Sequence, residues 1–218
     1  MLGCATARVS LRLCAKSKRI AKDRLHEVAE ACGRFSLPFI ARCAFVDSLR
    51  AAGCSRATIQ PGTPSLELKS SSLVGDAIPP KYSSCGGQDG TSPELSWGAL
   101  PEHTRSLALI AFDKDSPFGF KFTHWVLYDL PKDKRELAED VPKQEQLPDG
   151  SRQGSNDYDR IGYVGPCPPG HSPHHYVFDL YALDTKLNLP PKASKKQVLK
   201  AMKGHVLASG ELVGRFEH

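Results

Sequence analysis

The sequence predicts an all-β fold, a two-sheet antiparallel β-sandwich with a small C-terminal helix. The first supporting observation is a series of short apolar segments, rich in aromatic and branched residues, bounded by Pro, Gly, Asp or Ser clusters. The second is that a strong helix signal occurs once, near the C-terminus. The third is that strands and helices do not alternate, which argues against a doubly wound parallel sheet. We expect one globular domain over residues 65–218.

Five segments of this domain have strand character. Residues 107–112 (LALIAF) are apolar throughout, which is typical of a buried strand. Residues 124–130 (HWVLYDL) and 176–183 (YVFDLYAL) combine aromatic and branched residues, and alternate side chains of the latter segment share one face. Weaker strands are expected at residues 66–70 and 212–216.

One helix is expected close to the C-terminus. Ser194 is followed three residues later by Gln197, which is the spacing of a capping box. Val198 and Met202 then recur at helical spacing, and Gly204 is a typical residue just past a helix end. These signals place the helix between Ser194 and Gly204.

The N-terminal 64 residues differ from the rest of the chain. They hold 11 of the 29 Lys and Arg residues but only 4 of the 24 Asp and Glu residues, so the excess positive charge belongs to this segment. The remainder is slightly acidic, which gives no electrostatic reason to expect nucleic acid as a partner. Residues 1–64 can be interpreted as a structureless extension, a targeting segment or an interaction arm.

The hydropathy of the chain argues against a transmembrane segment, because no apolar run of 18 or more residues is present. We expect a cytoplasmic protein, or an organelle-imported one if residues 1–64 are a transit peptide. The sequence does not indicate an oligomeric state.

Five of the seven cysteines precede residue 65, and only Cys85 and Cys167 lie in the domain. The number is odd, the spacing is irregular and no Cys-x-x-Cys occurs, so neither a zinc site nor a dense disulfide framework is indicated. Cys85 and Cys167 can pair in an oxidising compartment, but we expect two free thiols.

Polar residues cluster at the ends of the three strong strands. Asp113 and Asp115 follow the first strand, His124 begins the second, and His174 and Tyr176 begin the third. Neighbouring strand ends would gather these groups at one rim of the sandwich. The long connection before the third strand contains GYVGPCPPG, whose prolines fix φ and whose glycines permit unusual backbone.

Such a rim suits a small anion such as a phosphate. The imidazoles of His124 and His174, the Tyr176 hydroxyl and the Gly165 N–H can donate hydrogen bonds to an anion. The two carboxylates cannot donate when ionised, and we expect them to accept ring N–H groups and so orient the histidines. Because imidazolium donates more strongly than imidazole, binding should strengthen as the pH falls toward about 6.

Plainer interpretations exist for each residue. The two carboxylates can form a turn or be solvated, His124 can be a half-buried strand residue, and His171 and His175 are expected to be solvent-exposed. An alternative from another class is a metal-dependent hydrolase that uses the same two carboxylates with His124 and His174. A further alternative is an interaction scaffold with a vestigial pocket. Motifs for nucleotide phosphates, zinc proteases and serine hydrolases are absent.

Six motifs, in order and at matching separations, resemble the phosphatidylethanolamine-binding protein family in its bacterial Raf-kinase-inhibitor-like branch. The resemblance covers about residues 66–216. The motifs are SPELSW at 92–97, DKDSP at 113–117, HWV at 124–126, GSNDYDRIGY running into GPCPPG over 154–170, HHY at 174–176 and YALD at 181–184.

This resemblance implies a β-sandwich with a small pocket for phosphate-type groups, such as phospholipid head groups and phosphorylated residues. It also implies a protein without cofactor or enzymatic activity that binds a ligand and inhibits a kinase or protease. By carry-over, the pocket is lined by Asp113, Asp115, His124, Gly165, Pro168, His174 and Tyr176. Two positions depart from the family pattern. Lys114 stands where Pro is usual, and His175 replaces an Arg, so a fixed charge becomes mostly neutral at pH 7.

Overall fold

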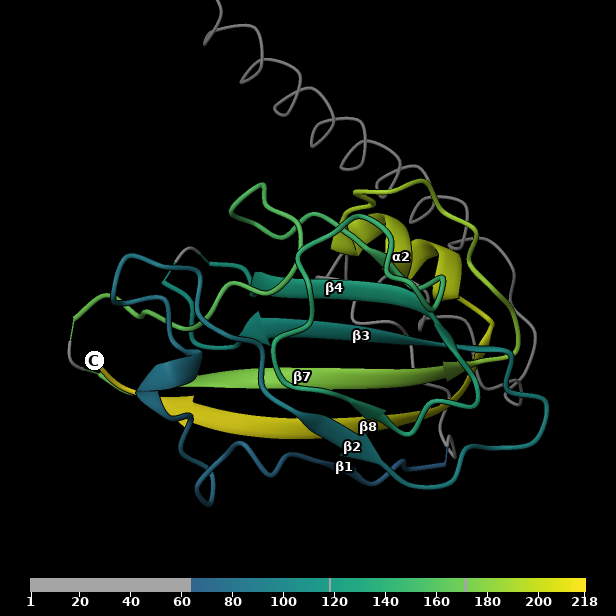
Figure 1. The fold of residues 1–218 in the computed structure, drawn as a ribbon, viewed down its shortest axis with the longest axis horizontal. Coiled ribbons are helices and arrows are strands. Elements are labelled where there is room, and N and C mark those ends of the chain that lie inside the picture. Colours follow the sequence, from purple (N-terminus) through teal and green to yellow (C-terminus); the bar gives the residue numbers. More distant parts are fainter. Residues whose placement is uncertain (1–63, 118, 171) are drawn as a thin grey trace, which may run out of the picture. The chain divides into compact units, whose positions relative to one another are not determined.

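The computed structural model describes residues 64–218, with the exception of Phe118 and His171, and confirms the all-β class. It contains a five-stranded antiparallel sheet in the order β6-β4-β3-β7-β8 and a three-stranded antiparallel sheet in the order β1-β2-β5 (Figure 1). The strands are β1 (Leu68–Lys69), β2 (Leu95–Trp97), β3 (Ser106–Asp113), β4 (Phe122–Pro131), β5 (Glu136–Leu137), β6 (Arg152–Gln153), β7 (His174–Leu183) and β8 (Val206–Phe216). The described residues also form a 3-10 turn, η1 (Pro80–Tyr82), and a helix, α2 (Lys195–Met202).

The interpretations of the N-terminal extension and of His171 concern residues outside this description, apart from Pro64. Within the described part of the chain, no helix is long and apolar enough to cross a membrane.

The three strong strands predicted from the sequence form the centre of the large sheet as β3, β4 and β7. The short strands β2, β5 and β6 were not predicted, because two or three residues carry no periodic pattern. Strand β8 begins six residues earlier than expected, since Gly210 and Gly214 weaken its strand signal. A Cβ on Gly210 would lie 2.5 Å from Leu66 O, so this glycine allows the chain entering the domain to pass close to β8.

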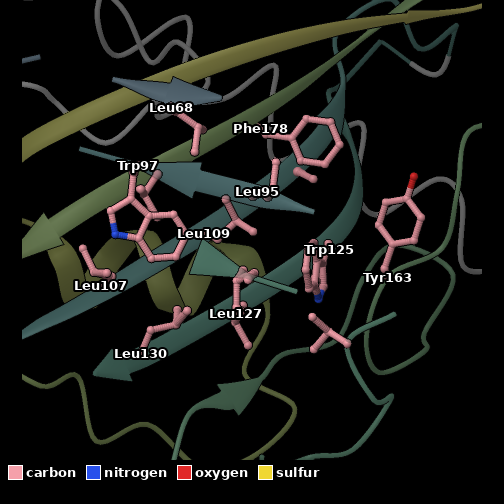
Figure 2. Close-up of a cluster of buried hydrophobic side chains, with 14 of the residues drawn as sticks. Leu68, Leu95, Trp97, Leu107, Leu109, Trp125, Leu127, Leu130, Tyr163 and Phe178 are labelled. Carbon is pink, nitrogen blue, oxygen red and sulfur yellow. The ribbon is translucent and has the colours of Figure 1, made fainter. Parts of the chain in front are cut away.

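The main core lies between the two sheets. Figure 2 shows side chains of the small sheet, among them Leu95 and Trp97, facing Leu109, Leu127 and Phe178 of the large sheet. Leu95 and Leu127 are fully buried, and burying such a side chain contributes roughly 2 kcal/mol to folding. This core fixes the large sheet, on whose end the candidate site is built.

Helix α2 covers the opposite face of the large sheet. Its buried residues Val198 and Met202 belong to a second apolar cluster that includes Ile110 of β3. The predicted capping box is confirmed, because Ser194 accepts from the Gln197 N–H and its own N–H donates to Gln197 Oε1 at 2.9 Å.

A disulfide joins two loops that lie 82 residues apart in the sequence. Cys85 and Cys167 are bonded, with their Cα atoms 5.0 Å apart, so the expectation of two free thiols was wrong. The loops are also held by hydrogen bonds from Ser84 to Pro166 O (3.0 Å) and to Gly165 O (2.9 Å). The spacing of the two cysteines in the sequence does not predict that the fold brings them together.

Candidate functional site

Four of the predicted site residues meet at one end of the large sheet, on the left of Figure 1. Strand β3 ends there at Asp113, which pairs with Phe122 of β4 and with Tyr176 of β7. His174 Nδ1 lies 2.7 Å from Asp113 Oδ2. The rings of His124 and Tyr176 meet edge to face with their centroids 5.2 Å apart. The expected gathering of these groups at one rim is therefore present.

His124 enters the site from a β-bulge in β4. The register shifts after Ala111, which pairs with Trp125, and His124 is left as an extra residue without a partner on β3. Its side chain is buried (4% exposed), and its Nδ1 lies 2.7 Å from Val164 O. A carbonyl oxygen only accepts, so this contact fixes the hydrogen of His124 on Nδ1.

Two adjacent histidines of β7 pair with two carboxylates on opposite faces of the strand, because successive strand residues point to opposite sides. His174 is buried and donates to the Asp113 carboxylate, which orients its ring. This is the contact that the sequence analysis predicted for Asp113. His175 is exposed, as expected, and bonds to Asp115 Oδ2 through Nδ1 (2.6 Å) and its backbone N–H (2.8 Å).

The expectation that Asp115 orients a histidine of the pocket was wrong. The chain leaves its extended path after Asp113, and the Asp115 N–H donates to Asp113 Oδ1 at 2.8 Å, which turns the second carboxylate toward the exposed His175. Burial alone would raise the pKa of Asp115, but the hydrogen bonds from His175 outweigh it and hold that pKa below its usual value.

Gly165 contributes space rather than a hydrogen-bond donor. Its N–H donates to Asp89 O at 2.7 Å, so the expectation that this N–H faces a ligand was wrong. A Cβ at this position would lie 2.1 Å from Tyr82 O, so only glycine fits between the two loops. Pro168 is buried in the same loop, next to the disulfide-bonded Cys167.

Three aromatic residues near His124, namely Phe120, Phe122 and Tyr158, form an aromatic wall that the sequence analysis did not predict. Tyr158 lies edge to face against His124 (5.7 Å between centroids) and against Phe122 (4.8 Å), and Phe122 stacks on Phe120 at 6.1 Å. Phe120 and Tyr158 are 48% and 41% exposed, so this part of the wall is open to solvent. Tyr158 lies within the motif at 154–163, but no periodic pattern marks it as part of a site.

Three polar atoms of buried residues at this place make no side-chain hydrogen bond to the described part of the chain. They are His124 Nε2, His174 Nε2 and Tyr176 Oη, on residues that are 4%, 8% and 3% exposed. The hydrogen bonds of both histidines run through Nδ1 to protein oxygens. No side-chain nitrogen or oxygen among the described residues is both sealed from solvent and unpaired, so these three atoms border accessible space. Unpaired polar atoms on otherwise buried side chains indicate a binding site for a small polar molecule.

The protonation states of the site follow from burial. Burial lowers the pKa of His124, against the opposing effect of the Asp113 and Asp157 carboxylates, so the ring is neutral at pH 7. Burial, reinforced by Asp113, raises the pKa of Tyr176, which therefore keeps its hydroxyl proton. Among the described residues, the ion-pair partners of Asp113 and Asp115 are histidines rather than lysine or arginine.

A metal ligand set is not formed by these residues. Within residues 64–218, Phe118 and His171 aside, no group of three or more His, Cys, Asp or Glu side chains is arranged to hold a metal ion. The carboxylates of Asp113 and Asp115 are directed to different histidines. The metal-dependent alternative therefore lacks a ligand set in this part of the chain.

Residues 69–217 match the sequence profile of the phosphatidylethanolamine-binding protein family. The chain belongs to this family. The match runs from Lys69 in β1 past the end of β8, and includes every residue of the candidate site. The resemblance inferred from the six motifs is thereby confirmed.

Relatives of this chain occur in archaea and bacteria. A UPF0098 protein of Methanothermobacter thermautotrophicus is 50% identical over 139 residues, which are 64% of this chain and 89% of the relative. A UPF0098 protein of Aquifex aeolicus is 47% identical over 145 residues, 66% of this chain and 82% of the relative.

Two solved structures share the phosphatidylethanolamine-binding protein fold. A phosphatidylethanolamine-binding protein homolog from Chlamydia trachomatis has a TM-score of 0.62 and 38% identity, covering 71% of this chain and 98% of its own. Escherichia coli YbcL, described as a member of the mammalian family, has a TM-score of 0.64 and 32% identity, covering 70% and 98%.

Proposed function

We propose that this protein binds a small phosphate-type ligand, without catalysis, in the accessible space bordered by His124, His174 and Tyr176, which we call the pocket. The observation that carries the proposal is the set of three unpaired polar atoms on side chains that are otherwise buried. These three atoms border accessible space, so they can pair with solvent in the free protein and with a ligand that takes its place.

The shape of the site adds to this proposal. The aromatic rings of Phe122 and Tyr158 wall one side, and such rings pack against the carbon skeleton that carries a phosphate group. Membership of the phosphatidylethanolamine-binding protein family agrees with a ligand-binding role. A phospholipid head group and a phosphorylated residue share the chemistry that this pocket would recognise.

Calorimetric titration of the full chain tests the proposal. Phenyl phosphate represents a phosphorylated residue, and glycerophosphoethanolamine represents a phospholipid head group. We expect saturable binding of at least one of them at about pH 6, and the tighter ligand identifies the source. Absence of saturable heat with both ligands would refute the function.

A matched pair of variants locates the binding. His174→Ala should weaken binding by about tenfold or more, since it removes one unpaired nitrogen and the partner of Asp113. His205→Ala removes a histidine with the same contact to a carboxylate, 2.7 Å from Asp184, at an exposed place outside the pocket, and should leave binding unchanged. Equal effects of both variants would contradict the location.

The further role as a kinase or protease inhibitor is an extension of this proposal that rests on the family resemblance. It would place the exposed Tyr158 beside the partner, because its ring lies against that of His124.

A further inference from the structure

When the rings of His124 and His174 carry a hydrogen on Nδ1 alone, the pocket presents hydrogen-bond acceptors where an anion needs donors. Nδ1 of His124 donates to Val164 O, and Nδ1 of His174 donates to the Asp113 carboxylate. A neutral imidazole carries one hydrogen, so Nε2 of each ring then holds a lone pair. With both rings neutral, Tyr176 Oη is the one donor among the three unpaired atoms.

The groups around the two rings are negative or neutral. The groups that face His124 are the carboxylates of Asp113 and Asp157, the backbone of Val164 and Gly165, and the rings of Phe122, Tyr158 and Tyr176. His174 is faced by Asp113 and interacts with Asp115. Both phenols keep their protons, because burial raises the pKa of Tyr158 and Tyr176. A doubly charged phosphate group would therefore meet lone pairs and like charges.

We propose that the pocket binds its phosphate-type ligand together with one proton. The inference rests on the proposed function and adds the charge state in which the ligand is held. A proton on either Nε2 converts an acceptor into a charged donor, which strengthens the hydrogen bond to a phosphate oxygen. Asp113 balances the imidazolium that forms at His174, because their side chains are already bonded. The same charge state arises when a phosphate monoester enters as its monoanion and donates its own hydroxyl to Nε2.

The ligand class follows from this charge balance. The pocket selects groups that hold one negative charge in the complex, and it discriminates against a dianion unless a proton accompanies it. A phosphate monoester has its second pKa at about 6, so it loses the required proton just below neutral pH. Affinity for a monoester should therefore fall as the pH rises above this value.

Proton uptake is measured directly by titrating the full chain with phenyl phosphate at about pH 8, where the free ligand is a dianion. Titrations in two buffers of different ionisation enthalpy give the number of protons bound with each ligand. We expect about one proton, and a dissociation constant that falls about tenfold for each pH unit between about pH 8 and pH 7.

Two results distinguish the failure of this inference from the failure of the function. Binding with no proton uptake, and with an affinity that does not change with pH, would overturn the inference and leave the function intact. No binding between about pH 6 and pH 8 would overturn both.

Variants identify the ring that takes the proton. His174→Gln offers an amide N–H near the position of Nε2 without needing a proton, so uptake should disappear if His174 is the acceptor. Uptake that persists in His174→Gln and disappears in His124→Gln assigns the proton to His124. His205→Gln, outside the pocket, should keep both the affinity and the proton uptake of the unaltered chain. Loss of uptake in His205→Gln would contradict the inference.

Discussion

His174 Nδ1 lies 2.7 Å from Asp113 Oδ2, and both side chains are buried at the point where β3 ends and β7 begins. Because the pair joins the ends of β3 and β7, it contributes both to the stability of this end of the sheet and to the orientation of the His174 ring in the pocket. Asp113 accepts a second hydrogen bond from the Asp115 N–H, so one carboxylate holds both a pocket histidine and the turn that follows β3.

Asp113→Ala should lower the free energy of unfolding by about 1–3 kcal/mol, because it leaves the buried Nδ1 of His174 and the Asp115 N–H without an acceptor. Urea unfolding followed by tryptophan fluorescence measures the change. Asp184→Ala, which removes the exposed partner of His205, should cost less than about 1 kcal/mol. A loss at Asp113 no larger than at Asp184 would contradict a structural role for the buried pair.

The ligand-free protein should lose stability as the pH falls below 6.5, the usual pKa of a histidine. Burial lowers the pKa of His124 in the folded state, so protonation favours the unfolded chain, and the stability present above pH 6.5 decreases on acidification. The loss is at most about 1.4 kcal/mol per pH unit for this group. Urea unfolding at about pH 7.5 and pH 5.5 measures it.

His124→Phe provides the comparison, because it keeps a ring but cannot titrate. Its stability should depend less on pH over this range than that of the unaltered chain, although it is lower throughout for lack of the bond to Val164 O. An equal pH dependence of both proteins would show that His124 is not the responsible group. Ligand affinity, by contrast, should rise as the pH falls over the same range.

Removal of the disulfide by the double substitution Cys85→Ser and Cys167→Ser should lower the free energy of unfolding by about 4 kcal/mol. The size of the effect reflects the 82-residue separation, because a bond that closes a long loop restricts the unfolded chain strongly. The folded domain should persist, since hydrogen bonds from Ser84 still join the two loops. Unchanged stability of the variant would show that the bond does not form in solution.

Gly165→Ala should destabilise the domain by about 3 kcal/mol or more, because the added Cβ would lie 2.1 Å from Tyr82 O, and backbone must move to admit it. Gly86→Ala, on the same pair of loops, meets nothing within 4 Å and should change stability by less than about 1 kcal/mol. Thermal unfolding of both variants makes the comparison. A mild effect at Gly165 would mean that the two loops can separate at little cost.

The central sheet could be predicted from sequence because its strands are long and apolar. β3 is buried over its whole length, and β7 is buried except at His175, so hydrophobic residues dominate both segments. Helix α2 could be predicted because the spacing of Ser194 and Gln197 is that of a capping box, which marks the N-terminus of a helix. Only the last part of the edge strand β8 was predicted, because Gly210 and Gly214 weaken the strand signal. Both glycines lie against another segment of the chain, where a Cβ would not fit.

The candidate site was predictable where residues sit at strand ends, and not where it depends on loops. Asp113, His124, His174 and Tyr176 meet because antiparallel strands return to the same edge. The direction of Asp115, the use of the Gly165 N–H and the aromatic wall at Tyr158 are set by turns whose geometry has no periodic signal. The separate roles of the two adjacent histidines follow only once the register of β7 is known.

The bond between Cys85 and Cys167 has a consequence for where the protein can work. Disulfides persist in oxidising compartments and are reduced in the cytosol by glutathione and thioredoxin. Cys167 is exposed, so such reductants can reach it. A chain made in a reducing cell would carry two thiols and a less constrained loop at 164–170, whereas an exported copy would carry the covalent link. Whether the link is present in a cell therefore depends on the compartment in which the chain folds.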